Sequence, residues 1–207
     1  MMERLRQTPS QTVGPFFAYA LTAEQYGYAY NSLMNHALVS EETPAQYAGT
    51  ERILITGRVF DGAGQPVPDA IVELWQADPL GQYQTEPINL ALNPFGGPYF
   101  VGFGRVGTGT HPKQYFTFST LKPGIVSEGS APHINVLLFM RGSLHCLRTR
   151  IYFSDEAEAN AQDTLLNDVP EDRRATLIAQ RREQHGQVFY DFDIYMQGDG
   201  ETIFFAL

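Results

Sequence analysis

The chain has 207 residues, of which 43% are hydrophobic and 13% aromatic, and a formal net charge of −9. That composition is typical of an ordinary globular protein, and the length favours one domain with extensions. The negative charge argues against nucleic acid or an anionic membrane as a partner. Cys146 is the only cysteine, so no internal disulfide can form, which suits a reducing compartment. The N-terminal MMERLRQTPS lacks the apolar core of a signal peptide and no apolar run approaches the length of a membrane span, so we expect a soluble, cytoplasmic protein.

Residues 1–50 are predicted to form an extended N-terminal arm. The bend at Gly14-Pro15 disfavours both helix and strand. The tyrosines that follow are too many for a solvated tail, so we expect the arm to lie on its own domain or on another chain. These tyrosines are Tyr19, Tyr26, Tyr28 and Tyr30.

From residue 51 the pattern becomes typical of β-structure, and residues 51–207 are predicted as the core of a single domain. Alternating or continuous apolar runs separated by turn residues predict strands at 53–59, 71–76, 114–120, 133–139, 144–153 and 187–196. The fold class expected is all-β, a β-sandwich of mixed sheets with a short helical insert. Residues 77–98 are predicted as a long functional or interfacial loop.

Two helices are expected near the C-terminal third. Ser154 is the candidate N-cap of the first, and Pro170 is the candidate first residue of a second that runs to residue 184 with a solvated face. Arg148 and Arg150 alternate on one face of the strand before them and are expected to pair with acids.

The segment 133–139, HINVLLF, is the longest nearly unbroken apolar run and is predicted to be a buried strand. Successive strand side chains point to opposite faces, so His133 and Asn135 lie side by side on one face. Two histidines there could bind one metal ion, but an amide is a weak ligand for ferric or zinc ions. Nearby, Trp75 is expected in the core and Tyr83 at a hydrogen-bonded loop edge.

The motifs together resemble the intradiol ring-cleavage dioxygenases over nearly the whole chain. The resemblance rests on Thr12-x-Gly14-Pro15-Phe16, Ile55-x-Gly57-x-Val59, Val72-Glu73-Leu74 with Gly81-x-Tyr83, Lys122-Pro-Gly124 and Pro132-His133-Ile134. It implies an oxidoreductase fold in which two tyrosines and two histidines hold Fe(III), to which tyrosinate is a suitable hard anionic ligand.

Carried across position by position, the resemblance gives this chain only half of the ligand set. The first tyrosine matches Tyr83 and the first histidine matches His133, whereas the second tyrosine falls on Val126 and the second histidine on Asn135. An arginine of active members falls near Ser130. The resemblance therefore implies no metal ligands and no catalytic residues in this chain.

One branch of the family explains such a loss, because its enzymes combine an iron-free α subunit with a homologous β subunit that carries Fe(III). This branch implies a large α–β hetero-oligomer that cleaves 3,4-dihydroxybenzoate with O₂ to 3-carboxy-cis,cis-muconate in aromatic catabolism, by the β-ketoadipate pathway. The α chain lends substrate-binding residues, and the matching positions are Thr12, Gly14, Pro15 and Arg141. An arginine can pair with the substrate carboxylate, although Arg141 could equally make a structural ion pair.

Two other functions remain open from the sequence. The chain could be a self-sufficient metalloenzyme that uses Tyr83 and His133 with a further ligand such as Glu86 or Glu128. It could also be a non-catalytic β-sandwich binding or structural protein, because fold does not imply function.

Overall fold

The computed structural model describes residues 12, 14, 19–28, 36–85 and 97–206, and strands dominate this part of the chain. The strands are β1 Arg52–Phe60, β2 Ile71–Gln76, β3 Phe103–Gly107, β4 Tyr115–Leu121, β5 His133–Phe139, β6 Leu147–Phe153, β7 Ile178–Gln184, β8 Gln187–Asp191 and β9 Ile194–Tyr195. The helices are α2 Ala157–Gln162 and α3 Thr164–Asp168, and the 3₁₀ segments are η1 Ala23–Tyr26, η2 Ala45–Tyr47, η4 Thr108–Thr110 and η5 Glu171–Leu177. Within the described ranges, no helix is long and apolar enough to cross a membrane.

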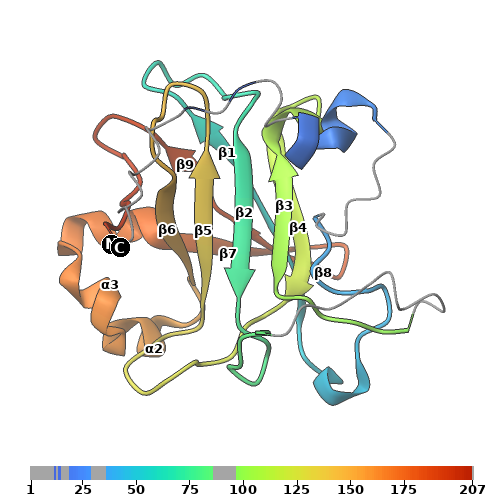
Figure 1. The fold of residues 1–207 in the computed structure, drawn as a ribbon. Coiled ribbons are helices and arrows are strands. Elements are labelled where there is room, and N and C mark those ends of the chain that lie inside the picture. Colours follow the sequence, from blue (N-terminus) through green and yellow to red (C-terminus); the bar gives the residue numbers. More distant parts are fainter. Residues whose placement is uncertain (1–11, 13, 15–18, 29–35, 86–96, 207) are drawn as a thin grey trace, which may run out of the picture.

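The strands form one mixed sheet in the order β3-β2-β5-β6-β7-β8-β1-β4, with β9 paired to β1. Most neighbours are antiparallel, but β6–β7, β1–β8 and β1–β9 are parallel. The sheet curves round so that β5 and β2 lie in front of β7 and β1, and the two short helices sit at one side (Figure 1). The expected all-β class with mixed strand pairing is confirmed. The strands belong to one continuous path rather than to two separate sheets.

The main core lies between the two halves of this sheet because each strand turns one set of alternate residues inward. In β1, Ile53, Ile55 and Val59 are fully buried while their neighbours are half-buried, as the alternation predicts. Phe116 and Phe118 of β4 enter the same cluster, together with alternate residues of β2, β5 and β6. This packing fixes the outer face of β5, which carries His133 and Asn135.

The segment around Leu38 joins the two edges of the sheet. The Leu38 amide donates to the Ser119 carbonyl of β4 at 2.8 Å, and the Leu38 carbonyl accepts from the Val101 amide, just before β3, at 2.9 Å. Its side chain is fully buried in the main core. Part of the predicted arm is therefore built into the sheet.

The prediction of a helix from Pro170 to residue 184 is wrong in its second half. Pro170 precedes the short η5, after which the chain becomes β7 and pairs with both β6 and β8. Ala179 is buried and the residues after it are exposed. Sheet pairing thus overrides the helical propensity of RRATLIAQRRE, while the expected exposure of its charges is retained.

The Ser154 cap is also wrong, since α2 begins later, after Glu156, and the Ser154 hydroxyl instead accepts the Arg181 amide at 2.9 Å. The real side-chain cap belongs to α3, where Asp163 accepts the Leu166 amide at 2.7 Å. Because α2 is preceded by a tight turn after β6, the residue that starts the turn is not the residue that starts the helix.

Candidate functional site

Tyr83, His133 and Asn135 meet at the end of the sheet face where β2 ends and β5 begins. We call these three residues the Tyr83 cluster. The Tyr83 hydroxyl lies 3.4 Å from His133 Nε2, and the Asn135 amide nitrogen donates to the same hydroxyl at 2.8 Å. The prediction that His133 and Asn135 share a face is confirmed. His133 is only 4% exposed, so half of a metal-ligand pair does stand on a buried strand.

The proton positions in the Tyr83 cluster follow from its partners. His133 Nδ1 lies 2.8 Å from the Ala131 carbonyl, which can only accept, so Nδ1 carries the proton in the neutral ring and Nε2 accepts from Tyr83. Burial lowers the pKa of His133, and the neighbouring Arg150 guanidinium lowers it further. The imidazole is therefore held neutral near neutral pH.

Arg150 is a member of this site that the sequence analysis did not identify. It stands opposite Asn135 in the β5–β6 register, and its Nε donates to the Asn135 side-chain oxygen at 3.1 Å. The expected acid partner of Arg150 is not found among the described residues, where its Nε instead donates to this amide. The signal that could have found it is the antiparallel hairpin itself, which pairs position 135 with position 150.

Two loops abut beside the Tyr83 cluster. A Cβ added to Gly81, whose φ is +79°, would lie 2.0 Å from the Ile125 carbonyl oxygen, and one added to Gly124 would lie 2.3 Å from that of Pro79. This close approach, which only glycine permits, places Val126 next to the turn that leads to Tyr83. Val126 supplies no donor atom there.

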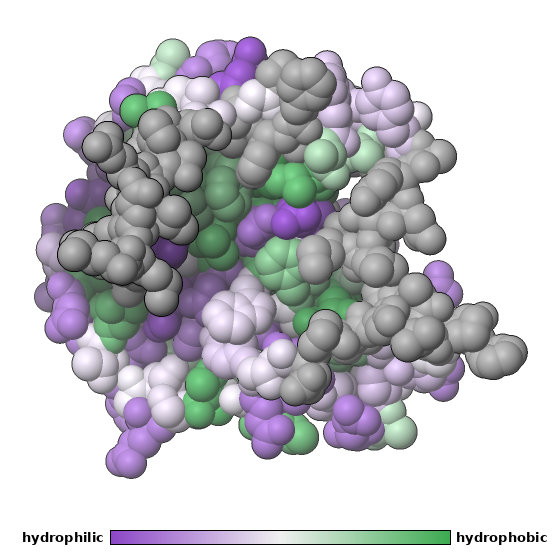
Figure 2. Space-filling model, in the orientation of Figure 1, coloured by the Kyte–Doolittle hydropathy of each residue, from purple (hydrophilic) through white to green (hydrophobic). Residues whose placement is uncertain are grey.

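Trp75 is not in the core, contrary to expectation. It is 42% exposed, and its ring packs on Tyr83 with 4.5 Å between ring centroids. It lies on the outer face because its neighbours Leu74 and Gln76 point inward. Figure 2 shows apolar side chains gathered near the centre of this face of the molecule.

Asp163, which is only 1% exposed, contacts the cluster indirectly through Ala131. Besides capping α3, it accepts the Ala131 amide at 2.8 Å and the Tyr152 hydroxyl at 3.0 Å. Since Ala131 in turn accepts from His133, Asp163 fixes the ring through the backbone. At the position of the family arginine, the Ser130 hydroxyl donates to the neighbouring Ala131 carbonyl at 3.3 Å.

The residues of the Tyr83 cluster do not fit a ferric ion. A metal would need the Tyr83 oxygen deprotonated and the lone pair of His133 Nε2 free, but one shared proton lies between these two atoms. Asn135 presents its N–H group to Tyr83, and Arg150 adds a positive charge. Among the described residues, no group of three or more His, Cys, Asp or Glu side chains could hold a metal ion.

Two of the predicted substrate-binding residues meet at the turn between β5 and β6: Arg141 lies in the turn, and Thr12 of the N-terminal arm contacts it. The Thr12 hydroxyl accepts the Gly142 amide at 3.0 Å and lies 3.4 Å from the Met140 carbonyl. The side chain of Arg141 is 70% exposed and pairs through Nε with the Asp69 carboxylate. The ion pair foreseen for Arg141 is present, and its role toward substrate stays a prediction.

The other predicted residues of this surface are less constrained. A Cβ at Gly14 would meet none of the described residues within 4 Å, so no contact in the described part of the chain requires glycine there. Pro15 lies outside the described residues, as does Tyr30 of the predicted arm. The tyrosines Tyr19 and Tyr26 are exposed and contact each other edge to face at 4.6 Å. Burial of the hydroxyl and the nearby Asp69 raise the pKa of Tyr26, while the positive charge of Arg141 acts in the opposite direction.

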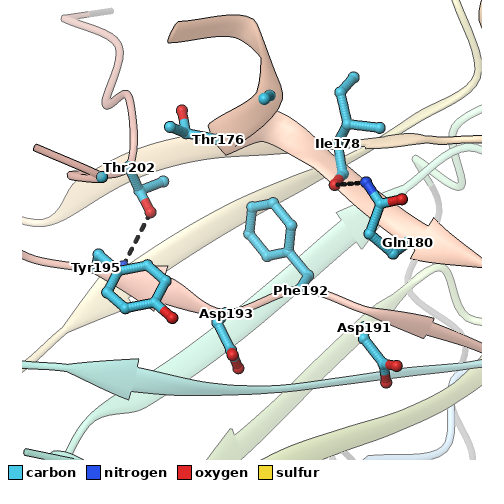
Figure 3. Close-up of a pocket in the computed structure, with 10 residues that line it drawn as sticks. Thr176, Ile178, Gln180, Asp191, Phe192, Asp193, Tyr195 and Thr202 are labelled. Atoms are coloured by element: carbon cyan, nitrogen blue, oxygen red, sulfur yellow. Dashed lines mark hydrogen bonds between the residues drawn. The ribbon is translucent and has the colours of Figure 1, made fainter. Parts of the chain in front are cut away.

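A separate cavity of about 420 Å³ lies between η5 and β7 on one side and β8 and β9 on the other (Figure 3). Its carboxylates already have partners: Asp191 pairs with Arg182 at 2.6 Å, and Asp193 accepts the Arg58 amide at 2.8 Å. None of the predicted site residues lines it. We assign this cavity no function.

The family model described as "Dioxygenase" matches residues 24–198. The chain therefore belongs to the dioxygenase family, and the resemblance to the intradiol ring-cleavage enzymes is confirmed. It is 48% identical over 205 residues to the protocatechuate 3,4-dioxygenase alpha chain of Burkholderia cepacia, covering 99% of each chain. The beta chain from the same organism is 33% identical over 164 residues, covering 73% of this chain and 67% of the relative. A solved dioxygenase domain from Streptomyces sp. SirexAA-E is 25% identical with a TM-score of 0.60, covering 92% of this chain and 97% of that one.

Proposed function

We propose that this chain is the iron-free α subunit of a heteromeric protocatechuate 3,4-dioxygenase. A homologous β subunit would hold the Fe(III), and the complex would cleave 3,4-dihydroxybenzoate with O₂ to 3-carboxy-cis,cis-muconate. The observation that carries this proposal is the Tyr83 cluster, whose donor atoms are consumed by hydrogen bonds with one another. The end-to-end match to an alpha chain supports the same assignment.

In this proposal the chain contributes by binding and orienting substrate at the partner's site. Residues 1–50 would act as an arm at the subunit interface, with Thr12, Gly14 and Pro15 lining the partner's pocket. Arg141 stands on an exposed turn, so its guanidinium can face another chain. A positive charge there would attract the carboxylate of 3,4-dihydroxybenzoate and orient its ring. The bound Fe(III) of the partner would supply the oxidative chemistry.

A cytoplasmic location is part of the proposal. It is supported by the presence of a single cysteine, Cys146, which cannot form an internal disulfide and so suits a reducing compartment.

The alternative of a self-sufficient metalloenzyme has less support. Glu128, one of the two carboxylates considered as an additional ligand, is exposed on its loop, and Glu86 lies outside the described residues. Tyr83 and His133 would each have to give up an existing hydrogen bond before binding a metal.

The proposal is tested by iron content and visible absorbance of the chain purified alone and together with its partner. Tyrosinate bound to Fe(III) absorbs visible light, so the protein reports its own ligands. We expect an iron-free, colourless chain and a coloured, active complex. Stoichiometric iron and colour in the chain alone would refute the α-subunit assignment.

A further inference from the structure

We propose that the guanidinium of Arg150 takes the place of a bound metal ion at the Tyr83 cluster and closes the cluster to metals. The proposal goes beyond the loss of two metal ligands, because Arg150, which matches no ligand position of the family, is given the role of excluding metal ions. It shares with the proposed function only the premise that this chain holds no iron. The wild-type measurement below tests that premise separately.

The first support is the direction of the hydrogen bonds. Arg150 Nε donates to the Asn135 oxygen at 3.1 Å, and the Asn135 nitrogen donates to the Tyr83 hydroxyl at 2.8 Å. Tyr83 then donates to His133 Nε2 across 3.4 Å, and His133 Nδ1 donates to Ala131 at 2.8 Å. Every donor in this chain of bonds points away from Arg150.

The second support is the effect of Arg150 on the orientation of Asn135. A guanidinium can only donate, so it holds the amide oxygen toward itself and turns the N–H group toward Tyr83. The Trp75 carbonyl, which accepts from the same nitrogen at 3.2 Å, favours that orientation as well. A metal beside Tyr83 would meet the positive end of the amide.

The third support is the charge of Arg150. No carboxylate in the described part of the chain makes an ion pair with it. The nearby Asp163 is already occupied by two backbone amides and the Tyr152 hydroxyl. The Asp163 carboxylate keeps its negative charge while it accepts these neutral donors, and it acts on His133 in the sense opposite to Arg150. Arg150 is hydrogen-bonded to the cluster itself through Asn135, so its positive charge would repel a second cation there at short range.

The test introduces one metal ligand at position 135 and measures whether Arg150 still prevents metal binding. Asn135→His places an imidazole beside Tyr83 and His133, which gives three donors of the kind that bind Zn²⁺ or Co²⁺. We compare N135H, N135H/R150Q and N135H/R148Q in the full-length chain. Arg148 is the matched control, because it lies on the same face of β6, two residues before Arg150, opposite Leu137 rather than position 135.

We expect N135H/R150Q to bind one Zn²⁺ per chain at least roughly tenfold more tightly than N135H or N135H/R148Q, because it alone removes the adjacent charge. Calorimetric titration gives the affinities, and the visible bands of Co²⁺ report the ligand geometry. Equal affinity in all three variants would overturn the role of Arg150 and leave the proposed function intact. Tight binding of Fe(III) by the wild-type chain would overturn both.

Folding of each variant is checked by circular dichroism. If the imidazole does not fit, Asn135→Asp supplies a carboxylate of the same shape as the native amide, and the same comparison is made with R150Q and R148Q. An affinity that rises with R148Q as much as with R150Q would again contradict the proposal.

Discussion

At the scale of single residues, Tyr83 illustrates how a side chain typical of a metal ligand can serve a different purpose. Its hydroxyl accepts a hydrogen bond from the Asn135 amide and donates one to His133 Nε2, so Tyr83 links the loop after β2 to β5. The ring also packs against Trp75. These contacts make Tyr83 a structural residue of the loop.

Replacing Tyr83 by phenylalanine removes both hydrogen bonds and keeps the ring. We expect the free energy of unfolding to fall by about 1 kcal/mol, because His133 Nε2 loses its partner while Asn135 keeps the Trp75 carbonyl. Urea denaturation measures this change. The complex with the partner should keep its iron and its kcat. Tyr195→Phe, at an exposed tyrosine, is the control and should leave stability unchanged. Loss of iron from the Y83F complex would contradict this assignment.

The sequence could predict the pairing of His133 with Asn135, because strand alternation alone places them on one face. It could not predict Arg150, since an arginine on a strand is ordinarily solvated or paired with an acid. It also misplaced Trp75, because a large apolar ring is expected inside, whereas the alternation of β2 turns Leu74 and Gln76 inward and leaves Trp75 exposed on the outer face.

At the scale of elements, the break between β8 and β9 depends on a glycine in β1. One continuous strand was expected over 187–196, but the chain leaves the ladder at Phe192 and Asp193 and rejoins β1 at Ile194. The Asp193 carboxylate takes over the ladder bond to the Arg58 amide at 2.8 Å. A Cβ on Gly57 would lie 1.8 Å from the Phe192 carbonyl oxygen, so only glycine allows this bulge to lie on β1.

Gly57→Ala should therefore lower the free energy of unfolding by about 1–3 kcal/mol, because backbone atoms must move apart. Thermal unfolding measures the shift. Gly200→Ala is the matched control, since an added Cβ there meets none of the described residues within 4 Å. Loss of glycine by itself lowers the entropy of the unfolded chain and does not destabilise, so an equal loss of stability in the two variants would contradict the role of the close approach at Gly57.

A polar network joins the ends of β4, β6 and β8. Lys122 contacts Asp155 at 2.8 Å and Glu156 at 2.6 Å, and the Tyr190 hydroxyl donates to Asp155 at 2.9 Å. Burial alone would raise the pKa of Asp155, but the hydrogen bonds from Lys122 and Tyr190 outweigh it and lower the pKa. Burial and the Asp155 carboxylate raise the pKa of Tyr190 to about 12.

A depressed carboxyl pKa stabilises the fold at pH values above the unfolded pKa, about 4, and this contribution is lost as the pH falls through the lower folded value. We expect the urea midpoint of the wild type to fall on acidification below about pH 4. Lys122→Met should be less stable at neutral pH and show a smaller acid-dependent fall. Arg182→Met, which breaks an exposed pair with Asp191, is the control. A wild-type acid slope in K122M would contradict the assignment.

Sequence patterns predicted most strands with their buried faces, because a period of two residues is set by the backbone itself. They failed at β7, where local propensity favoured helix, although β8 follows β7 directly through a turn at His185 and Gly186. They also failed at the β8–β9 break, because the required close approach depends on Gly57 more than a hundred residues earlier.

At the scale of the whole molecule, the ion pair between Arg141 and Asp69 offers a way to separate a structural role from a role in substrate binding. If Arg141 orients substrate in the partner's site, Arg141→Ala should raise the KM for 3,4-dihydroxybenzoate by about tenfold, the loss expected for one charge-assisted hydrogen bond. Asp69→Asn removes the partner and keeps the guanidinium. It should leave KM unchanged or lower it.

Steady-state kinetics of the reconstituted complex, with the α–β association constant measured alongside, decides between these roles. Equal increases in KM for both variants would indicate that the pair only holds the turn between β5 and β6. An unchanged KM in R141A would remove Arg141 from the substrate-binding residues.

The segment around Leu38 affects whether this chain aggregates before it binds a partner. An open sheet edge invites pairing with any other exposed strand, and natural proteins protect such edges. Here the protection comes from a part of the predicted N-terminal arm, because the Leu38 amide donates to edge strand β4 and the Leu38 carbonyl accepts from the segment just before β3. A chain that begins at residue 19 keeps the segment around Leu38, whereas a chain that begins after residue 40 lacks it and exposes both edges of the sheet. We therefore expect the second truncated chain to aggregate and the first to stay monodisperse, because the segment around Leu38 protects the sheet edges from self-association.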